Sequence, residues 1–386
     1  WMFARTLARM PDTRVSFVVR HTRRPAALTV EGVELVPVVD PLFRMREAID
    51  QYHADRNRYP ATLEALTDGF SDDIDPAWSP DAKTIAYITD QAGGQKLALY
   101  DVASGTERLL DLGSPPAFYY GPVWSPDSAK IAYTDNRNNL WMIELAGGKN
   151  TLVDSGTFTD PNVTMSATWS PDSKWLTWAR DLDSHMNAVF LYSLDSGKKT
   201  QVTDGLSNAK NPIFDRDGKS LYFFASTNWG PSISWLDLSS LTNRIVTSSV
   251  YCIVLRKDLP NPLQPESDEE KPKAEPPAGG QPPSGQDPPK KPEPPKFGID
   301  LDGIEQRIIA LPMGAADYRG LEPGRAGSVG AVSNPPGGMF GPGGGGSSIV
   351  KWTMSERKTT PFGSGSAITL SADGSKVLVM QGQAIA

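Results

Sequence analysis

The chain has 386 residues, and its 45 aspartate and glutamate residues outnumber its 38 lysine and arginine residues, giving a formal net charge of −7. This acidic balance argues against a nucleic-acid-binding protein, because such proteins usually carry a basic face. No apolar run approaches the roughly 18 residues that a membrane-spanning helix needs, so we expect no membrane span. The single cysteine, Cys252, excludes an intrachain disulfide and leaves the compartment open between cytoplasm and periplasm.

Residues 1–72 are expected to form a small α/β segment. Residues 15–19 and 34–39 read as strands, and apolar side chains at positions 42, 45, 49 and 52 follow the helical period of about 3.6. Residues 42–66 resemble the segment after the N-terminal helix of major pseudopilins of type II secretion. A genuine relationship, a chance match and a fusion artefact all stay open. Because the first residue is Trp1, we expect the true N-terminus to lie upstream.

From residue 73 onward, one motif recurs. It reads DPAWSPDAKTIAYI around Trp78, GPVWSPDSAKIAYT around Trp124 and SATWSPDSKWLTWA around Trp169. Weaker copies read NPIFDRDGKSLYFF around Phe214 and AITLSADGSKVLVM around Leu370. The first four copies are spaced by about 45 residues, a period typical of propellers and solenoids.

Each copy predicts a tight turn followed by a strand. Ser-Pro-Asp suits a type I turn, and the next residue must tolerate a positive φ. Glycine at that place is free of strain, whereas Ala82, Ser128 and Ser173 should each cost about 1 kcal/mol there. We therefore interpret the repeated aromatic residues as packing between blades and the repeated aspartates as turn stabilisers rather than metal ligands. These structural residues are Trp78, Pro80, Asp81, Trp124, Pro126, Asp127, Trp169, Pro171, Asp172, Phe214, Asp217, Gly218, Asp373 and Gly374.

A second hairpin follows each of the first three motifs, beginning at Leu97, Leu140 and Val189, with a Ser-Gly or Gly-Gly turn between two strand-like runs. Two hairpins make four antiparallel strands, which is one blade of a β-propeller. The sequence therefore predicts an all-β propeller of about five to six blades over residues 73–386. The fifth blade is degenerate, over about 315–360. The sixth begins near 367 and stops after one hairpin, so we expect an incomplete ring.

Two segments of the predicted propeller have the composition of loops. Residues 256–297 are rich in proline and charge and are expected to be a disordered insertion. The runs on either side, VYCIVLRK and EQRIIALPM, are expected to pair as a hairpin around it. A role for the insertion as a ligand for SH3-like grooves is the alternative. Residues 320–348 are glycine-rich and are expected to form a flexible loop rather than a phosphate site.

Catalytic patterns are missing from the sequence. The three histidines His21, His53 and His185 are too scattered for a multi-histidine site, and no HExxH, CxxC or GxSxG motif occurs. His185 near Asp181 suggests either a small metal or peptide site or, more simply, a solvated loop. Ser364 in FGSGSA is expected to lie in a turn. We therefore predict no catalytic residue, no metal site and no cofactor in this chain.

Longer strings carry a family resemblance. The WSPD units look like the repeats of TolB-like propellers. The strings WSPDSKWLTWARDLDSHMNAVFLYSLDSGKKTQVTDG (169–205), SVYCIVLRKDLPNPLQPESDEEKP (249–272) and GIEQRIIALPM (303–313) are similar to the propeller region of bacterial tricorn-type proteases, a group of serine peptidases. In that family the catalytic domain follows the propellers, so the resemblance implies that its nucleophile and base lie outside this chain.

The resemblance implies a non-catalytic propeller module that guides or filters peptides or unfolded protein segments for a catalytic domain. A TolB-like scaffold that binds a protein partner at the propeller mouth is one alternative. A secretion-system component, through residues 42–66, is another. Oligomerisation through the parent protease is compatible with the first hypothesis.

Overall fold

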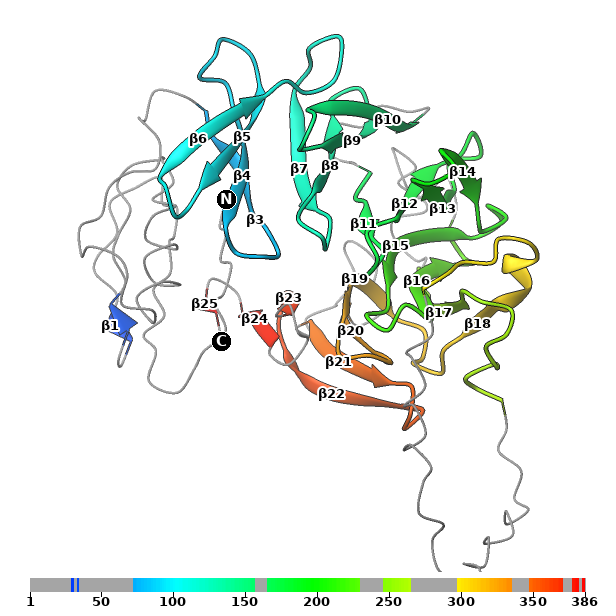
Figure 1. The fold of residues 1–386 in the computed structure, drawn as a ribbon. Coiled ribbons are helices and arrows are strands. Elements are labelled where there is room, and N and C mark those ends of the chain that lie inside the picture. The colour runs from blue at the N-terminus through cyan, green and yellow to red at the C-terminus, as the bar shows by residue number, and fades with distance from the viewer. Residues whose placement is uncertain are drawn as a thin grey trace, which may run out of the picture.

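A computed structural model describes residues 72–156, 165–229, 246–264, 297–334, 347–370, 377–381 and 384–385, and the pairs 29–30 and 33–34. Within these residues, five four-stranded antiparallel sheets follow one another along the chain, and a three-stranded sheet comes last. Figure 1 shows the sheets arranged around an arc, from blue at the first blade to red at the last sheet. The prediction of an all-β propeller with incomplete blades is confirmed.

Each blade takes four consecutive strands. Blade 1 comprises β3 (Ile74–Trp78), β4 (Thr84–Thr89), β5 (Lys96–Asp101) and β6 (Thr106–Leu110). Blade 2 comprises β7 (Tyr119–Trp124), β8 (Lys130–Asp135), β9 (Asn139–Glu144) and β10 (Lys149–Ser155). Blade 3 comprises β11 (Thr168–Trp169), β12 (Trp175–Asp181), β13 (Asn187–Ser193) and β14 (Lys198–Gln201).

The later sheets are less regular. Blade 4 comprises β15 (Asn208–Phe214), β16 (Ser220–Ser226), β17 (Ser249–Val254) and β18 (Ile308–Ala310), with a short 3₁₀ helix, η2 (Ile304–Arg307), before β18. Blade 5 comprises β19 (Asp317–Pro323), β20 (Ser328–Asn334), β21 (Ser348–Thr353) and β22 (Lys358–Ser364). The last sheet comprises β23 (Ala367–Leu370), β24 (Val377–Gln381) and β25 (Ala384–Ile385).

The hydrophobic core lies between blades. Side chains of a strand alternate between two faces, so each blade presents one apolar face to each neighbour. On β4, Ala86 and Ile88 pack against Tyr119 and Trp124 of blade 2, whereas Ile85 belongs to a smaller cluster on the other face of blade 1. Equivalent clusters join each later pair of neighbouring blades. Stability of one blade therefore depends on the blade beside it.

The first strand of each blade lies innermost, because first strands of neighbouring blades contact one another: β3 with β7, β15 with β19, and β19 with β23. These strands pair on one side only, and Pro76, Pro122 and Pro212 lie within them. Proline cannot donate to a ladder and is confined to sheet edges and bulges. Each of these three strands also has a register shift at the proline.

The strands on either side of the predicted insertion pair as expected, with Tyr251 of β17 opposite Ala310 of β18. The base of the insertion is held near blade 4, where the Lys257 amide donates to Asp300 Oδ2 at 2.8 Å. The Phe297 ring contacts Phe214 edge-on, with ring centroids 6.2 Å apart. Residues 265–296, which contain most of the proline-rich run, lie outside the described residues.

One loop prediction was wrong. Residues 320–323 and 328–334, expected in a loose glycine-rich segment, belong to β19 and β20. The high glycine content obscures the strand pattern in the sequence of this segment. Gly320 adjoins a bulge, and Gly327 takes a φ of 74° in the connecting turn. Small side chains pair across the sheet. Residues 335–346 of that segment lie outside the described residues.

In the segment before the propeller, the structure describes a two-stranded pair, β1 (Thr29–Val30) with β2 (Val33–Glu34). The pseudopilin-like stretch 42–66 and the predicted strand 15–19 lie outside the described residues. No helix in the described part of the chain has the length and apolar character that crossing a membrane requires.

Candidate functional site

The repeated turn has the geometry that its sequence predicts. In blade 1 the Ala82 amide donates to the Ser79 carbonyl at 2.9 Å, and Ala82 takes a φ of 59°. Asp81 Oδ1 accepts from Ser79 Oγ at 2.7 Å and from the Lys83 amide at 3.2 Å. Burial acts to raise the pKa of Asp81, but these hydrogen bonds and the Lys83 charge outweigh it, so the pKa is lowered.

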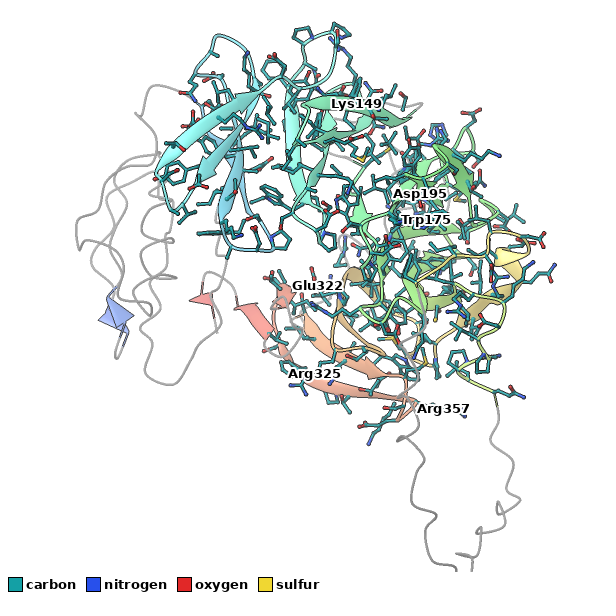
Figure 2. The ribbon with its side chains drawn as sticks, in the orientation of Figure 1. Lys149, Trp175, Asp195, Glu322, Arg325 and Arg357 are labelled. Atoms are coloured by element: carbon teal, nitrogen blue, oxygen red, sulfur yellow. The ribbon has the colours of Figure 1, made fainter. Side chains whose placement is uncertain are left out.

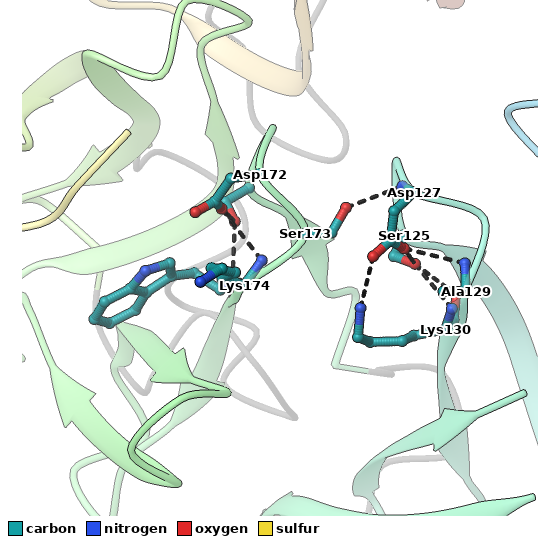
Figure 3. A network of polar contacts seen from close by, with 9 residues as sticks. Ser125, Asp127, Ala129, Lys130, Asp172, Ser173 and Lys174 are labelled. Carbon is teal, nitrogen blue, oxygen red and sulfur yellow. Dashed lines mark hydrogen bonds and ion pairs between the residues drawn. The ribbon is translucent and has the colours of Figure 1, made fainter. Parts of the chain in front are cut away.

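Blades 2 and 3 repeat this arrangement (Figure 3). Asp127 accepts from Ser125 Oγ, from the Ala129 amide at 3.0 Å and from Lys130 Nζ at 2.7 Å. Asp172 accepts from Ser170 Oγ at 2.6 Å. Each carboxylate is therefore occupied by donors of its own turn. Among the described residues, no group of three or more possible ligands is placed to hold a metal ion.

Neighbouring turns are also joined to each other. The Asp81 amide donates to Ser128 Oγ of blade 2 at 3.2 Å, and the Asp127 amide donates to Ser173 Oγ of blade 3 at 3.0 Å (Figure 3). Sequence reasoning treated Ser128 and Ser173 only as strained turn residues and missed this role. The available signal was a hydroxyl at the positive-φ position of the second and third turns, where blade 1 has alanine.

The repeat tryptophans make a second set of bonds between blades. Trp124 Nε1 donates to the Ala77 carbonyl at 2.9 Å, and Trp169 Nε1 donates to the Val123 carbonyl at 3.0 Å. Both acceptors lie in the first strand of the preceding blade, one residue before the repeat tryptophan of that blade. Both indoles are buried, with 9% and 8% exposure. Phe214 of blade 4 has no N–H to offer, and Thr168 Oγ1 instead donates to the Pro212 carbonyl at 2.9 Å.

A third set lies at the bulges of the inner strands. Asp75, Gly121 and Asn211 precede the three prolines and have φ values of 54°, 59° and 53°. The Gly121 amide donates to Asp75 Oδ2 at 2.8 Å, and Asn211 Nδ2 donates to the Leu321 carbonyl at 3.4 Å. Aspartate and asparagine tolerate this backbone region better than most residues. The first strands of the blades together form the inner wall of the propeller. These bonds at the bulges therefore link the inner strands of neighbouring blades.

A buried charge joins blades 2 and 3. The Asp154 side chain is 1% exposed and lies 3.1 Å from Arg180 Nε. It also accepts from Trp178 Nε1 at 2.9 Å and pairs with Lys199 Nζ. The two cationic side chains and the Trp178 N–H therefore all contact the Asp154 carboxylate, at the outer part of the interface between blades 2 and 3.

Blade 4 departs from the pattern. Asp215 takes the place that Ser79, Ser125 and Ser170 hold in blades 1 to 3, and it is 1% exposed. Its Oδ2 accepts from Tyr222 Oη at 2.7 Å and from the Gly327 amide of blade 5 at 2.9 Å. Burial, followed by the charge of Asp217, raises the pKa of Asp215 to about 6. Asp217 accepts from the Lys219 amide at 2.9 Å, and Gly218 takes the expected positive φ of 68°.

The remaining candidates that the structure describes do not assemble into a reactive site. His185 is exposed in a turn with a φ of 60°, and Ser364 is the last residue of β22 rather than a turn residue. Cys252 is fully buried, and burial raises the pKa of its thiol to about 12. His21, His53, Asp373 and Gly374 lie outside the described residues. The chemically capable groups of the repeat therefore serve the turns and the joints between blades.

Comparison with known proteins agrees with this architecture. The chain is similar to a putative tricorn protease homolog 2 of Streptomyces coelicolor, with 27% identity over 179 residues, 45% of this chain and 14% of that protein. It is also similar to a putative tricorn-like protease C-terminal subunit of Sulfurisphaera tokodaii, with 22% identity over 54% of this chain and 21% of that protein. The chain thus spans a small part of the length of these relatives.

A solved structure of the tricorn protease superposes with a TM-score of 0.58 at 20% identity, covering 77% of this chain and 27% of that one. At this identity the likeness concerns the fold. The family model described as "Tricorn protease second beta propeller domain" matches residues 74–386, which include all five blades and the last sheet. This chain belongs to the family of the tricorn protease second beta propeller domain.

Proposed function

We propose that this chain is the non-catalytic propeller module of a tricorn-like serine peptidase, and that it guides or filters peptides for a catalytic domain outside residues 1–386. The observation that carries the proposal is the family match over residues 74–386, which leaves only the first 73 residues outside the propeller. The small share of its relatives' length that the chain covers supports a module within a larger protein.

The inner wall suits extended peptides. Its strands are sheet edges, and a sheet edge presents unpaired backbone N–H and C=O groups that can bind another chain with little regard to its sequence. Lys210, on β15, adds a charged group: its ammonium lies 4.8 Å from the centroid of the Trp229 ring, and burial lowers its pKa. An ammonium beside an aromatic face offers a contact for peptide carbonyl or carboxylate groups.

Peptide binding tests the proposal directly. Fluorescein-labelled, reduced and alkylated casein fragments are titrated with the chain, and anisotropy is measured. We expect saturable binding to unfolded fragments, weaker binding by Lys210→Ala, and unchanged binding by Lys198→Ala, which removes an exposed lysine on β14, the outer edge strand of blade 3. The same samples are assayed for peptide hydrolysis, and we expect none.

Two results would contradict the proposal. Hydrolysis that copurifies with the chain would show that it is catalytic. Failure to bind any unfolded fragment, combined with stable capture of one folded protein, would favour the alternative of an interaction scaffold.

A further inference from the structure

The repeated turn of blade 4 lacks both groups that link the earlier blades on the turn side of their joints. In the two preceding joints, the hydroxyl of the fourth turn residue, Ser128 or Ser173, accepts an amide of the blade before. The repeat tryptophan donates to a carbonyl of that blade. In blade 4 the corresponding residues are Gly218 and Phe214, which have neither a hydroxyl nor a side-chain N–H. The turn side of the joint between blades 3 and 4 must therefore be closed by other means.

Phe297, at the far end of the insertion, fills the place of the missing hydroxyl. A Cβ atom at Gly218 would lie only 2.4 Å from Cδ2 of Phe297. Gly218 has a φ of 68°, close to the 58° of Ser128, so a side chain there would point as the serine does, toward the preceding blade. The Phe297 ring meets Phe214 edge-on and packs against the buried cluster that blades 3 and 4 share. Trp175 of blade 3, labelled in Figure 2, packs against the same cluster.

The segment that carries Phe297 is attached to blade 4 through its backbone. The Asp300 amide donates to the Leu255 carbonyl at 2.9 Å, and the Lys257 amide donates to Asp300 Oδ2 at 2.8 Å. Leu255 directly follows β17, so these bonds hold the end of the insertion on blade 4. They do not involve the phenyl ring, so we expect the segment to stay in place when the ring is removed.

Blades 3 and 4 are bonded directly to each other elsewhere in the joint. On the inner wall, Thr168 Oγ1 donates to the Pro212 carbonyl at 2.9 Å. At the end of β15 that lies away from the turn, the Asn187 amide donates to Asn208 Oδ1 at 3.0 Å. On the turn side, the bridge is Phe297, which belongs to neither repeat motif. The two ends of this joint are therefore held by different means.

We propose that Phe297 is an intramolecular clasp: it closes the turn side of the joint between blades 3 and 4, and this side opens when the phenyl ring is withdrawn. The clasp makes closure of the joint depend on the end of the insertion as well as on the two repeat motifs. It is a contact that can be removed without breaking the bonds on the inner wall. This device goes beyond peptide guiding and does not depend on it.

Hydrogen exchange measured by mass spectrometry on the full chain tests the clasp. In Phe297→Ala, protection of peptides covering the turns at 169–176 and 214–221 should fall on the order of 10-fold, because a half-buried aromatic side chain no longer opposes local opening. Peptides covering the turn at 124–131, in the joint between blades 1 and 2, should not change. The control is Phe362→Ala, which removes a phenylalanine that is 53% exposed on β22 and should leave all three turns unchanged.

A second substitution distinguishes a clasp from general stabilisation. Gly218→Ser in the parent chain should raise exchange at both turns, because the new Cβ meets the Phe297 ring. Combined with Phe297→Ala, the same substitution should restore protection, because the added hydroxyl can accept the Asp172 amide as Ser173 accepts that of Asp127. The effect of Gly218→Ser therefore changes sign between the two backgrounds.

Three results would overturn the proposal. The first is unchanged exchange at both turns in Phe297→Ala, and the second is an effect of Gly218→Ser with the same sign in both backgrounds. The third is an equal rise in exchange at the turn of blade 2, because the phenyl ring would then contribute only to general stability. If Phe297→Ala does not fold, Phe297→Leu gives the same comparison, with a smaller fall in protection expected.

Discussion

In the joints that link blades 1, 2 and 3, neutral donors cross from blade to blade: backbone amides to Ser128 and Ser173, and indole N–H groups to carbonyls. In the joint between blades 4 and 5, a buried aspartate accepts the crossing amide. The backbone turn is the same in both regions, with a positive φ at its fourth residue. Ser128 and Ser173 hold the fourth place of their turns, whereas Asp215 holds the first, so a different position of the turn makes the contact between blades in each region.

The largest expected effect comes from removing the repeat tryptophan of blade 2, whose indole links blades 1 and 2. Trp124→Ala removes a ring that is 9% exposed, together with its bond to the Ala77 carbonyl. The cavity and the lost burial should lower the free energy of unfolding by about 3–5 kcal/mol. Urea unfolding measures this loss.

A matched variant separates the stability lost with the aromatic packing from the stability lost with the indole hydrogen bond. Trp124→Phe keeps an aromatic ring and reproduces the residue at position 214 of blade 4, so it should cost about 1–2 kcal/mol, mainly for the unsatisfied carbonyl. An unchanged unfolding midpoint for Trp124→Ala would show that this tryptophan does not support the joint.

The buried ion pair between blades 2 and 3 gives the next effect. Asp154→Ala leaves Arg180, Lys199 and the Trp178 N–H without their shared acceptor. Breaking a buried pair from one side should cost about 3 kcal/mol at neutral pH, measured by urea unfolding.

The control is an exposed carboxylate. Asp195→Ala removes the partner of Lys174 on the surface of blade 3, where the aspartate side chain is 70% exposed, and should have little effect. Equal losses in the two variants would show that burial does not distinguish these pairs.

A third prediction concerns the sign of the pH response. A carboxyl whose pKa is raised by folding lowers stability as it ionises, so Asp215 should destabilise the fold between about pH 4 and pH 6 and at all higher pH values. Asp215→Asn keeps an acceptor for Gly327 and removes the charge. It should raise the free energy of unfolding at pH 8 by about 1–2 kcal/mol and have a smaller effect at pH 4.5. A variant that is less stable than the parent at pH 8 would show that the ionised Asp215 stabilises the fold, contrary to its raised pKa.

How much of this was predictable differs between the two regions. The WSPD motif predicts the turn, its positive φ and the following strand, because these depend on residues within five positions of each other. The contacts of Trp124 and Ser128 span 47 residues, and the repeat period suggested packing between blades without specifying the acceptor.

The fourth and fifth blades were harder to predict. The replacement of serine by Asp215 is visible in FDRD, but its partner Gly327 is 112 residues away, beyond an insertion that breaks the period. β19 and β20 were mistaken for a loop, since their strand character comes from pairing with each other and with β21 rather than from an alternating apolar pattern. Local chemistry is readable from the sequence, whereas long-range pairing in a degenerate blade is not.

The smallest expected effect separates backbone strain in the repeated turn from hydrogen bonding between blades 1 and 2. Ala82 and Ser128 occupy the same position with φ values of 59° and 58°, but only the serine hydroxyl accepts an amide from the preceding blade, at 3.2 Å. Glycine relieves the strain at either place, so Ala82→Gly should raise the free energy of unfolding by about 0.5–1 kcal/mol. Ser128→Gly gains the same relief but loses a hydrogen bond of similar value, so it should be close to neutral in urea unfolding. Equal stabilisation by both substitutions would mean that the serine hydroxyl contributes nothing to the joint between blades 1 and 2, which would then depend on its other contacts: the Trp124 indole, the bond from Gly121 to Asp75, and the apolar packing.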